Sequence, residues 1–292
     1  MELKHSVVIL TKDSDYHWYF ISEISKVARV EGIIFEQSKR KKSLFKRVKK
    51  HGLLWSVLKV FSKITAKSVF KVKNEFKQLV PNFDTETLKD KFDHLVHFVE
   101  DINCRSTKLL LAKIKPDYLC SLGGGLIDEV GLEAASKGAL NLHSGISPFY
   151  NGADMVDKVF ESRNLNLIGC TLMLMTSKID GGPILGHYLP GIEKTDSPRS
   201  LFMKNIIGGI ELYVDFLTSD ASQKINSLEL VKQKIPMHYY IGFDHTIMTD
   251  LVKMYFLKNG MTERFIRTSK TFKYYRETLD FNEFLKSIQV IE

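Results

Sequence analysis

The segment that decides the fold is "DYLCSLGGGLIDEVGLEAASKGALNLH", residues 117–143. It begins with a continuous apolar run that ends in three glycines, and a short helical stretch leads to a second apolar run, "ALNLH". Short apolar runs bounded by glycine are typical of buried strands. Two such strands joined by a helical segment predict a βαβ unit, in which the strands are parallel.

The same alternation continues on both sides of this segment. Upstream, two apolar runs, "HSVVIL" and "VEGIIFEQ", flank a helical pattern. Downstream, the chain continues with a helical pattern, "GADMVDKVFESRN", and two strand-like runs, "IGCTLMLMT" and "PILGHYLPG". A long helix then begins at "SPRS". We therefore predict an α/β fold for residues 1–217, a doubly wound, mostly parallel Rossmann-like sheet. Residues 218–292 are predicted to form a mixed C-terminal extension of unknown role, with a short helix near "FNEFLKSI".

Composition indicates a soluble intracellular protein. No apolar run approaches the roughly 20 residues that a membrane-spanning helix needs, and the N-terminal run "SVVIL" is expected to be a core strand and not part of a signal peptide. The three cysteines, Cys104, Cys120 and Cys170, form neither a CxxC pair nor a zinc-ligand spacing. A cytoplasmic location without a disulfide framework follows.

The positive charge is concentrated in one segment. The net charge is +8, and eight of the twelve residues from 39 to 50 are Lys or Arg. Apolar residues then recur at helical spacing beside a stripe of lysines, so residues 39–79 are predicted to be a basic amphipathic helical insertion. Such a segment is most often a solvated face. The functional alternatives are contact of residues 39–73 with an anionic membrane surface, with a nucleotide diphosphate or with RNA. Nucleic acid is the weakest of these alternatives, because the rest of the chain is near neutral.

Three predicted strand ends carry residues suited to chemistry. They are the glycines Gly123–Gly125, the pair Asn141 and His143, and Asp180 in "SKIDGGPI". In doubly wound folds, ligands bind beyond the carboxyl ends of the strands. An amide, an imidazole and a carboxylate would meet there, with Asp180 orienting His143 and Asn141 available to an oxyanion. Taken singly, each of these residues could equally be an ordinary turn residue.

Two familiar motifs are absent. The turn after the first strand, "TKDSD", has no dinucleotide-binding glycines, and the chain has no GxSxG nucleophile motif. Direct attack by a group of the substrate, without a covalent enzyme intermediate, suits these residues best.

Residues 98–190 resemble the catalytic core of the folate-dependent formyltransferases. The similar features are "KPD" before a strand, "NLH" followed by a Pro-x-Tyr-x-Gly turn, and a G-x-T whose threonine lies nine residues before the aspartate of "DGGPI". The resemblance is weaker over residues 1–38 and absent from the insertion and the C-terminal extension. The family includes methionyl-tRNA formyltransferase, glycinamide ribonucleotide formyltransferase and nucleotide-sugar N-formyltransferases.

The resemblance implies roles for individual residues. Asn141, His143 and Asp180 match the family's catalytic residues. The positions expected to line the folate are Leu122, Gly123, Gly124, Gly125 and Leu126 in one loop, and Thr176, Ser177, Lys178 and Ile179 in another. The implied formyl donor is N10-formyltetrahydrofolate, and no metal is required.

The implied reaction is formyl transfer to an amine. The amine attacks the formyl carbon, Asn141 and protonated His143 stabilise the oxyanion, and Asp180 holds the imidazole. Ser144, Asn151 and Gly181 depart from residues common in the family, and they lie on the side where the acceptor is expected.

The sequence leaves the acceptor open. A nucleotide-linked amino sugar of surface polysaccharide biosynthesis is the first hypothesis. The alternatives are methionyl-tRNA, hydrolysis of the formyl donor, and a catalytically silent binding relative. The sequence does not indicate the oligomeric state.

Overall fold

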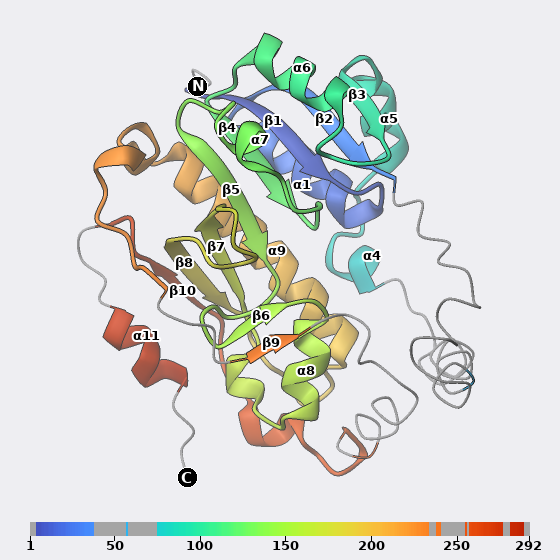
Figure 1. The fold of residues 1–292 in the computed structure, drawn as a ribbon. Coiled ribbons are helices and arrows are strands. Elements are labelled where there is room, and N and C mark those ends of the chain that lie inside the picture. Colours follow the sequence, from blue (N-terminus) through green and yellow to red (C-terminus); the bar gives the residue numbers. More distant parts are fainter. Residues whose placement is uncertain are drawn as a thin grey trace.

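The computed structural model describes residues 4–37, 57, 75–233, 238–240, 255, 257–276 and 281–288. Within these ranges it confirms the predicted α/β architecture. Eight strands form one sheet in the order β10-β8-β7-β5-β4-β1-β2-β3 (Figure 1). The strands are β1 (Ser6–Thr11), β2 (Arg29–Glu36), β3 (Val96–Val99), β4 (Tyr118–Leu122), β5 (Gly138–His143), β7 (Cys170–Leu174), β8 (Ile184–Leu189) and β10 (Lys270–Lys273). A separate two-stranded sheet pairs β6 (Tyr150–Gly152) with β9 (His238–Tyr240).

The sheet has a parallel half and an antiparallel half. Strands β3, β2, β1, β4 and β5 are parallel, and the strand order reverses between β1 and β4. Strands β7, β8 and β10 are antiparallel to their neighbours, a feature that the sequence analysis did not predict. The short loop from β7 to β8, residues 175–183, explains the antiparallel pairing of these two strands, because a parallel pair would need a crossover of a dozen or more residues.

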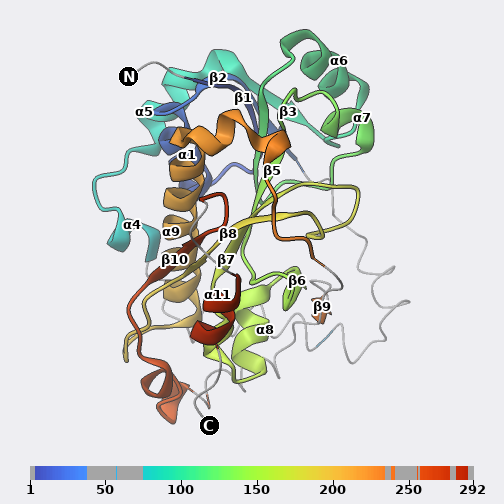
Figure 2. The same ribbon diagram turned by 90° about the vertical axis from the view of Figure 1, so that its left-hand side faces the viewer.

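Helices cover both faces of the sheet (Figure 2). On one face lie α1 (Asp15–Ser25), α5 (Thr85–Phe92) and α9 (Pro198–Thr218), and on the other lie α6 (Arg105–Ile114), the short α7 (Glu129–Leu132) and α11 (Phe281–Ile288). The remaining helices are α4 (Glu75–Leu79) and α8 (Met155–Glu161).

Strand β1 shows why both faces are covered. Val7 and Ile9 pack into the cluster formed with α1 and α9, whereas Val8 and Leu10 pack into a second cluster that includes Leu111 of α6. A strand whose consecutive residues are all apolar has two apolar faces to bury. A sheet with helices on both sides buries both faces.

Helix α9 lies against the antiparallel half of the sheet at unusually close range. Its N-terminus is capped by Ser197, whose side chain accepts from Ser200 N, and Pro198 follows. A Cβ at Gly208 would lie 2.0 Å from the ring of Tyr188, and one at Gly209 would lie 2.5 Å from a sulfur in β7. The two glycines therefore allow close packing that offsets their low helix propensity.

The C-terminal extension is mixed, as predicted. It contains short 3-10 turns, β9, the edge strand β10 and α11, which packs over the sheet near β8 and β10. The division of the chain at residue 217 stays a prediction, and β10 completes the same sheet.

The basic insertion lies almost entirely outside the described residues. Of residues 39–79, the structure describes only Val57 and α4. The predicted membrane contact of residues 39–73 therefore falls on residues about which the structure says nothing further. Among the described residues, no helix is both long and apolar enough to cross a membrane.

Candidate active site

A cavity of about 660 Å³ opens at the carboxyl ends of β1, β4 and β5. This is the point at which the strand order reverses, where doubly wound folds bind ligands. Its volume is within the usual range for small-molecule sites. The cavity includes the predicted residues Leu122, Gly123, Gly124, Gly125, Leu126, Asn141, His143, Thr176, Lys178, Ile179 and Asp180. Ser177, the remaining predicted folate-lining residue, is exposed in the same loop and does not line the cavity.

Strand β5 supplies the imidazole and the amide. Leu140 and Leu142 point into the core cluster beneath α1 and α9, so Asn141 and His143 project from the opposite face of the strand. Their spacing of two residues therefore places both on the same side of the sheet, as the sequence analysis expected.

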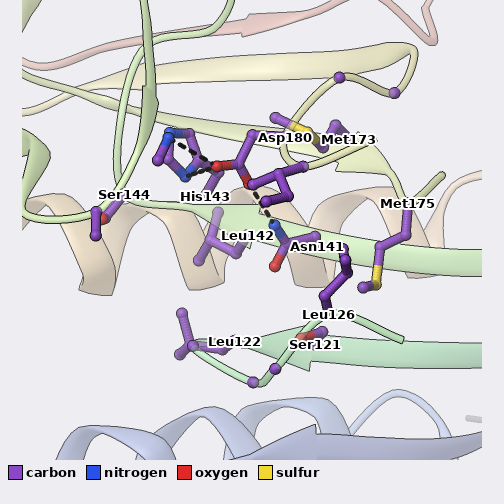
Figure 3. A pocket seen from close by; sticks show the side chains of 18 of the residues that line it. Ser121, Leu122, Leu126, Asn141, Leu142, His143, Ser144, Met173, Met175 and Asp180 are labelled. Carbon is purple, nitrogen blue, oxygen red and sulfur yellow. Dashed lines mark hydrogen bonds and ion pairs between the residues drawn. The ribbon is translucent and has the colours of Figure 1, made fainter. Parts of the chain in front are cut away.

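Asp180 joins these two side chains (Figure 3). Its Oδ1 accepts a long hydrogen bond from Asn141 Nδ2 at 3.4 Å, and its Oδ2 lies 3.5 Å from His143 Nδ1. The backbone N–H of Gly152 donates to Oδ2 at 2.9 Å. The Asp180 side chain is only 11% exposed. A carboxylate this buried requires donors, which Asn141 and Gly152 supply, while His143 Nδ1 faces it at a longer distance.

The imidazole of His143 is held on both nitrogens. Nε2 lies 2.9 Å from the carbonyl oxygen of Tyr150, and Nδ1 faces Asp180. Both neighbours are acceptors, so the ring can donate to both only in its doubly protonated form. Gly145 leaves the space that this arrangement needs, since a Cβ there would lie 2.6 Å from both His143 Nε2 and Tyr150 O.

The glycine loop after β4 forms one wall of the cavity and packs closely against neighbouring segments. A Cβ at Gly124 would lie 3.3 Å from Leu10 O, and one at Gly125 would lie 2.5 Å from the carboxylate of Glu36. Two apolar side chains lie on the cavity surface and remain solvent-exposed, Leu126 at 49% and Ile179 at 47%. Apolar side chains beside polar backbone atoms are typical of the walls of small-molecule sites.

The sequence analysis missed one wall of the cavity. Lys12, Tyr16 and His17 line it from the end of β1 and the start of α1. Ser14 Oγ lies 2.7 Å from His17 Nδ1, and burial lowers the pKa of His17 to about 3, with Lys12 adding to the shift. The available signal was topological: these residues follow the end of a strand at the reversal point, although the turn lacks a glycine motif.

Comparison with known proteins identifies the family. A model of the formyl transferase family matches residues 28–214, which is more than half of the chain. The chain belongs to the formyl transferase family. The resemblance drawn from the motifs is confirmed, and the family match extends well beyond residues 98–190.

Curated members of the formyl transferase family match part of the chain. A bifunctional polymyxin resistance protein ArnA from Wigglesworthia glossinidia brevipalpis is 30% identical over 49% of this chain and 22% of its own. A methionyl-tRNA formyltransferase from Hydrogenobaculum is 33% identical over 40% of this chain and 39% of its own. The matches thus span well under two thirds of these relatives.

Solved formyltransferase structures share the fold over most of the chain. A sugar N-formyltransferase from Shewanella has a TM-score of 0.52 at 12% identity, covering 85% of this chain and 86% of that one. A glycinamide ribonucleotide transformylase from Symbiobacterium toebii has a TM-score of 0.51 at 12% identity, covering 78% and 93%.

The packing around His143 predicts the effect of Gly145→Ala. The added methyl would meet His143 Nε2, Tyr150 O and Met155 Cγ, each at 2.6 Å. We expect a loss of about 1–3 kcal/mol in the free energy of unfolding, as is typical of overpacking. Urea denaturation measures it. Gly191→Ala is the control, because its Cβ would make only ordinary contacts of 3.4 Å and longer; equal stability of the two variants would contradict the packing.

The buried His17 predicts a pH dependence of stability. Its pKa is about 3 in the folded chain, against an ordinary value of 6.5. Between these values the unfolded chain binds a proton that the folded chain does not, so stability falls as the pH drops from 6.5 towards 3. His17→Gln should make this decline shallower, by up to about 1.4 kcal/mol per pH unit. Urea denaturation at pH 4 to 7 measures the slope, and identical slopes in the two proteins would contradict a neutral buried His17.

Proposed function

We propose that the protein is a folate-dependent N-formyltransferase that formylates the amine of a nucleotide-linked amino sugar. The observation that carries the proposal is the Asp180 carboxylate, which bridges the His143 imidazole and the Asn141 amide inside the cavity. The proposed setting is cytoplasmic surface-polysaccharide biosynthesis.

The three side chains have complementary roles in this reaction. The acceptor nitrogen forms a bond to the formyl carbon, the bond from that carbon to the donor N10 breaks, and a proton moves from the acceptor amine to N10. Asn141 has two amide hydrogens, and Asp180 accepts one of them. The second is available to the oxygen that becomes negative during attack. The imidazole of His143, placed between Tyr150 O and Asp180, would add positive charge beside that oxygen when it carries a proton on both nitrogens.

The proposed donor is N10-formyltetrahydrofolate, which supplies the formyl group. We assign its ring system to the wall formed by Leu122–Leu126 and by Thr176, Lys178 and Ile179. The two solvent-exposed apolar side chains, Leu126 and Ile179, would cover the faces of the ring, and the glycine backbone would offer donors and acceptors to its edge.

One comparison supports an amino sugar as the acceptor. The sugar N-formyltransferase from Shewanella aligns over 85% of this chain and 86% of its own. That protein therefore resembles this chain in length as well as in fold. Ser144 and Gly181, two of the positions that depart from the common family pattern, line the cavity and could contact the acceptor, whereas the third, Asn151, is buried beneath it.

A second candidate acceptor is methionyl-tRNA. Several curated relatives are methionyl-tRNA formyltransferases, although each matches only part of this chain. Binding of tRNA should weaken steeply with added salt, whereas binding of a small nucleotide-sugar should change far less.

The test is an assay with N10-formyltetrahydrofolate and a panel of dTDP-, UDP- and GDP-linked amino sugars, with methionyl-tRNA in parallel. Mass spectrometry should find one sugar heavier by a formyl group. Formylated methionyl-tRNA alone would assign the second acceptor. Release of formate without a formylated product would indicate hydrolysis, and no reaction of the donor would contradict the proposal.

The site predicts the effect of removing one oxyanion donor. Asn141→Ala should lower kcat by about 10²–10³-fold while the fold is retained, as is typical for such donors, and His143→Ala should abolish turnover. The control is Asn259→Ala, because that amide donates to Tyr255 O on the surface, away from the cavity. Equal rates in the Asn141 and Asn259 variants would exclude Asn141 from the reaction.

A further inference from the structure

The turn that contains Asp180 has a strained backbone. Asp180 has a φ of +47°, in the left-handed region that non-glycine residues rarely adopt. Two residues later, a Cβ at Gly182 would lie 1.8 Å from Leu174 O, so the turn is pressed against the end of β7. Such a conformation persists only where surrounding contacts hold it.

Gln233, in the C-terminal extension, supplies those contacts. Its Nε2 donates to Asp180 O at 2.9 Å and to Gly182 O at 2.7 Å, bridging both ends of the strained turn. Both partners are carbonyl oxygens, which accept, and the amide nitrogen has two hydrogens to donate. The other atom, Oε1, accepts from Asn151 Nδ2 at 3.4 Å.

Asn151 completes the arrangement from β6. Its side chain is fully buried, and Nδ2 donates to Asp180 O at 2.8 Å while Oδ1 accepts from Ser147 Oγ at 2.8 Å. The Asp180 carbonyl thus receives two amide donors, one from Asn151 and one from Gln233. Asn151 is also one of the residues at which the chain departs from the common family pattern.

The sheet brings Gln233 to this position. Val231 O accepts from Ile184 N at 2.8 Å, which pairs the extension with the start of β8 directly after the Asp180 turn. Beyond Gln233, strand β9 pairs in parallel with β6, which contains Asn151. The extension therefore pairs with the segment that follows the Asp180 turn and with strand β6, whose Asn151 and Gly152 contact Asp180.

We propose that Gln233 is a positioning residue, which holds the Asp180 turn so that its carboxylate reaches His143 and Asn141. The expected effect of Gln233 on catalysis rests on the proposed function. Its expected effect on the position of His143 does not depend on which reaction the site performs. The C-terminal extension is then a component of the active site, although Gln233 does not line the cavity.

Two variants and one control test this role. Gln233→Ala removes the donor, and Gln233→Glu keeps the size while placing an acceptor against two carbonyl oxygens. The control is Gln223→Ala, because Gln223 belongs to the same extension but contacts Lys137 and His5 at the opposite end of the strands. We expect kcat to fall about 10- to 100-fold in both Gln233 variants, as small misplacements of reacting groups do, with KM for the formyl donor within about two-fold of the unmodified protein.

A readout without substrate separates this inference from the proposed function. In protein labelled with ¹³C-histidine, the His143 ring signal, assigned by its loss in His143→Ala, should move in both Gln233 variants and stay unchanged in Gln223→Ala. A moved signal in a protein without formyltransferase activity would support the positioning role and overturn only the proposed reaction. An unmoved signal, or a rise in KM at unchanged kcat, would overturn the positioning role.

Discussion

The site depends on one buried carboxylate. The Asp180 side chain is only 11% exposed, so its carboxylate needs polar partners around it. Those partners are Asn141 and His143 on β5 and the backbone N–H of Gly152 at the end of β6. The carboxylate therefore links strand β5, strand β6 and the β7–β8 loop.

The antiparallel direction of β7 works against this convergence, and the loop after β7 compensates for it. Strand β7 runs antiparallel to β5, so the loop that follows β7 would by itself lie at the end of the sheet opposite His143. Residues 175–183 instead return along the sheet, and the Asp180 turn packs on the end of β7 near Leu174. The cost is a left-handed backbone at Asp180, offset by hydrogen bonds to its carbonyl oxygen from Asn151 and Gln233. A loop built in this way holds a charged group rigidly beside two others, which is the preorganisation that electrostatic catalysis needs.

Much of this arrangement could be predicted from local patterns. Apolar runs and glycines give the parallel strands, and the spacing of Asn141 and His143 places both side chains on one face of β5. Asp180 was expected to be their partner from its position beside a predicted strand, and the motif resemblance implied a catalytic role for it. Gln233 could not be predicted, because nothing near it in sequence marks a contact with a turn some fifty residues away.

The wall formed by Lys12 and His17 was missed for another reason. Its turn lacks the glycines that signal a ligand loop, and only the strand order places it at the cavity. The antiparallel direction of β7, β8 and β10 also escaped prediction, since apolar strands read alike in either direction.

The central claim is that this carboxylate, imidazole and amide transfer a formyl group to an amine. The most direct measurement follows the formyl carbon itself, by ¹³C NMR, in a reaction of N10-[¹³C]formyltetrahydrofolate with excess amino-sugar nucleotide and the full-length protein. The account predicts that the donor signal decays as a formamide signal grows on the sugar nitrogen, and that Asp180→Asn nearly stops the conversion. A label that stays on the donor, or appears only as free formate, would contradict it.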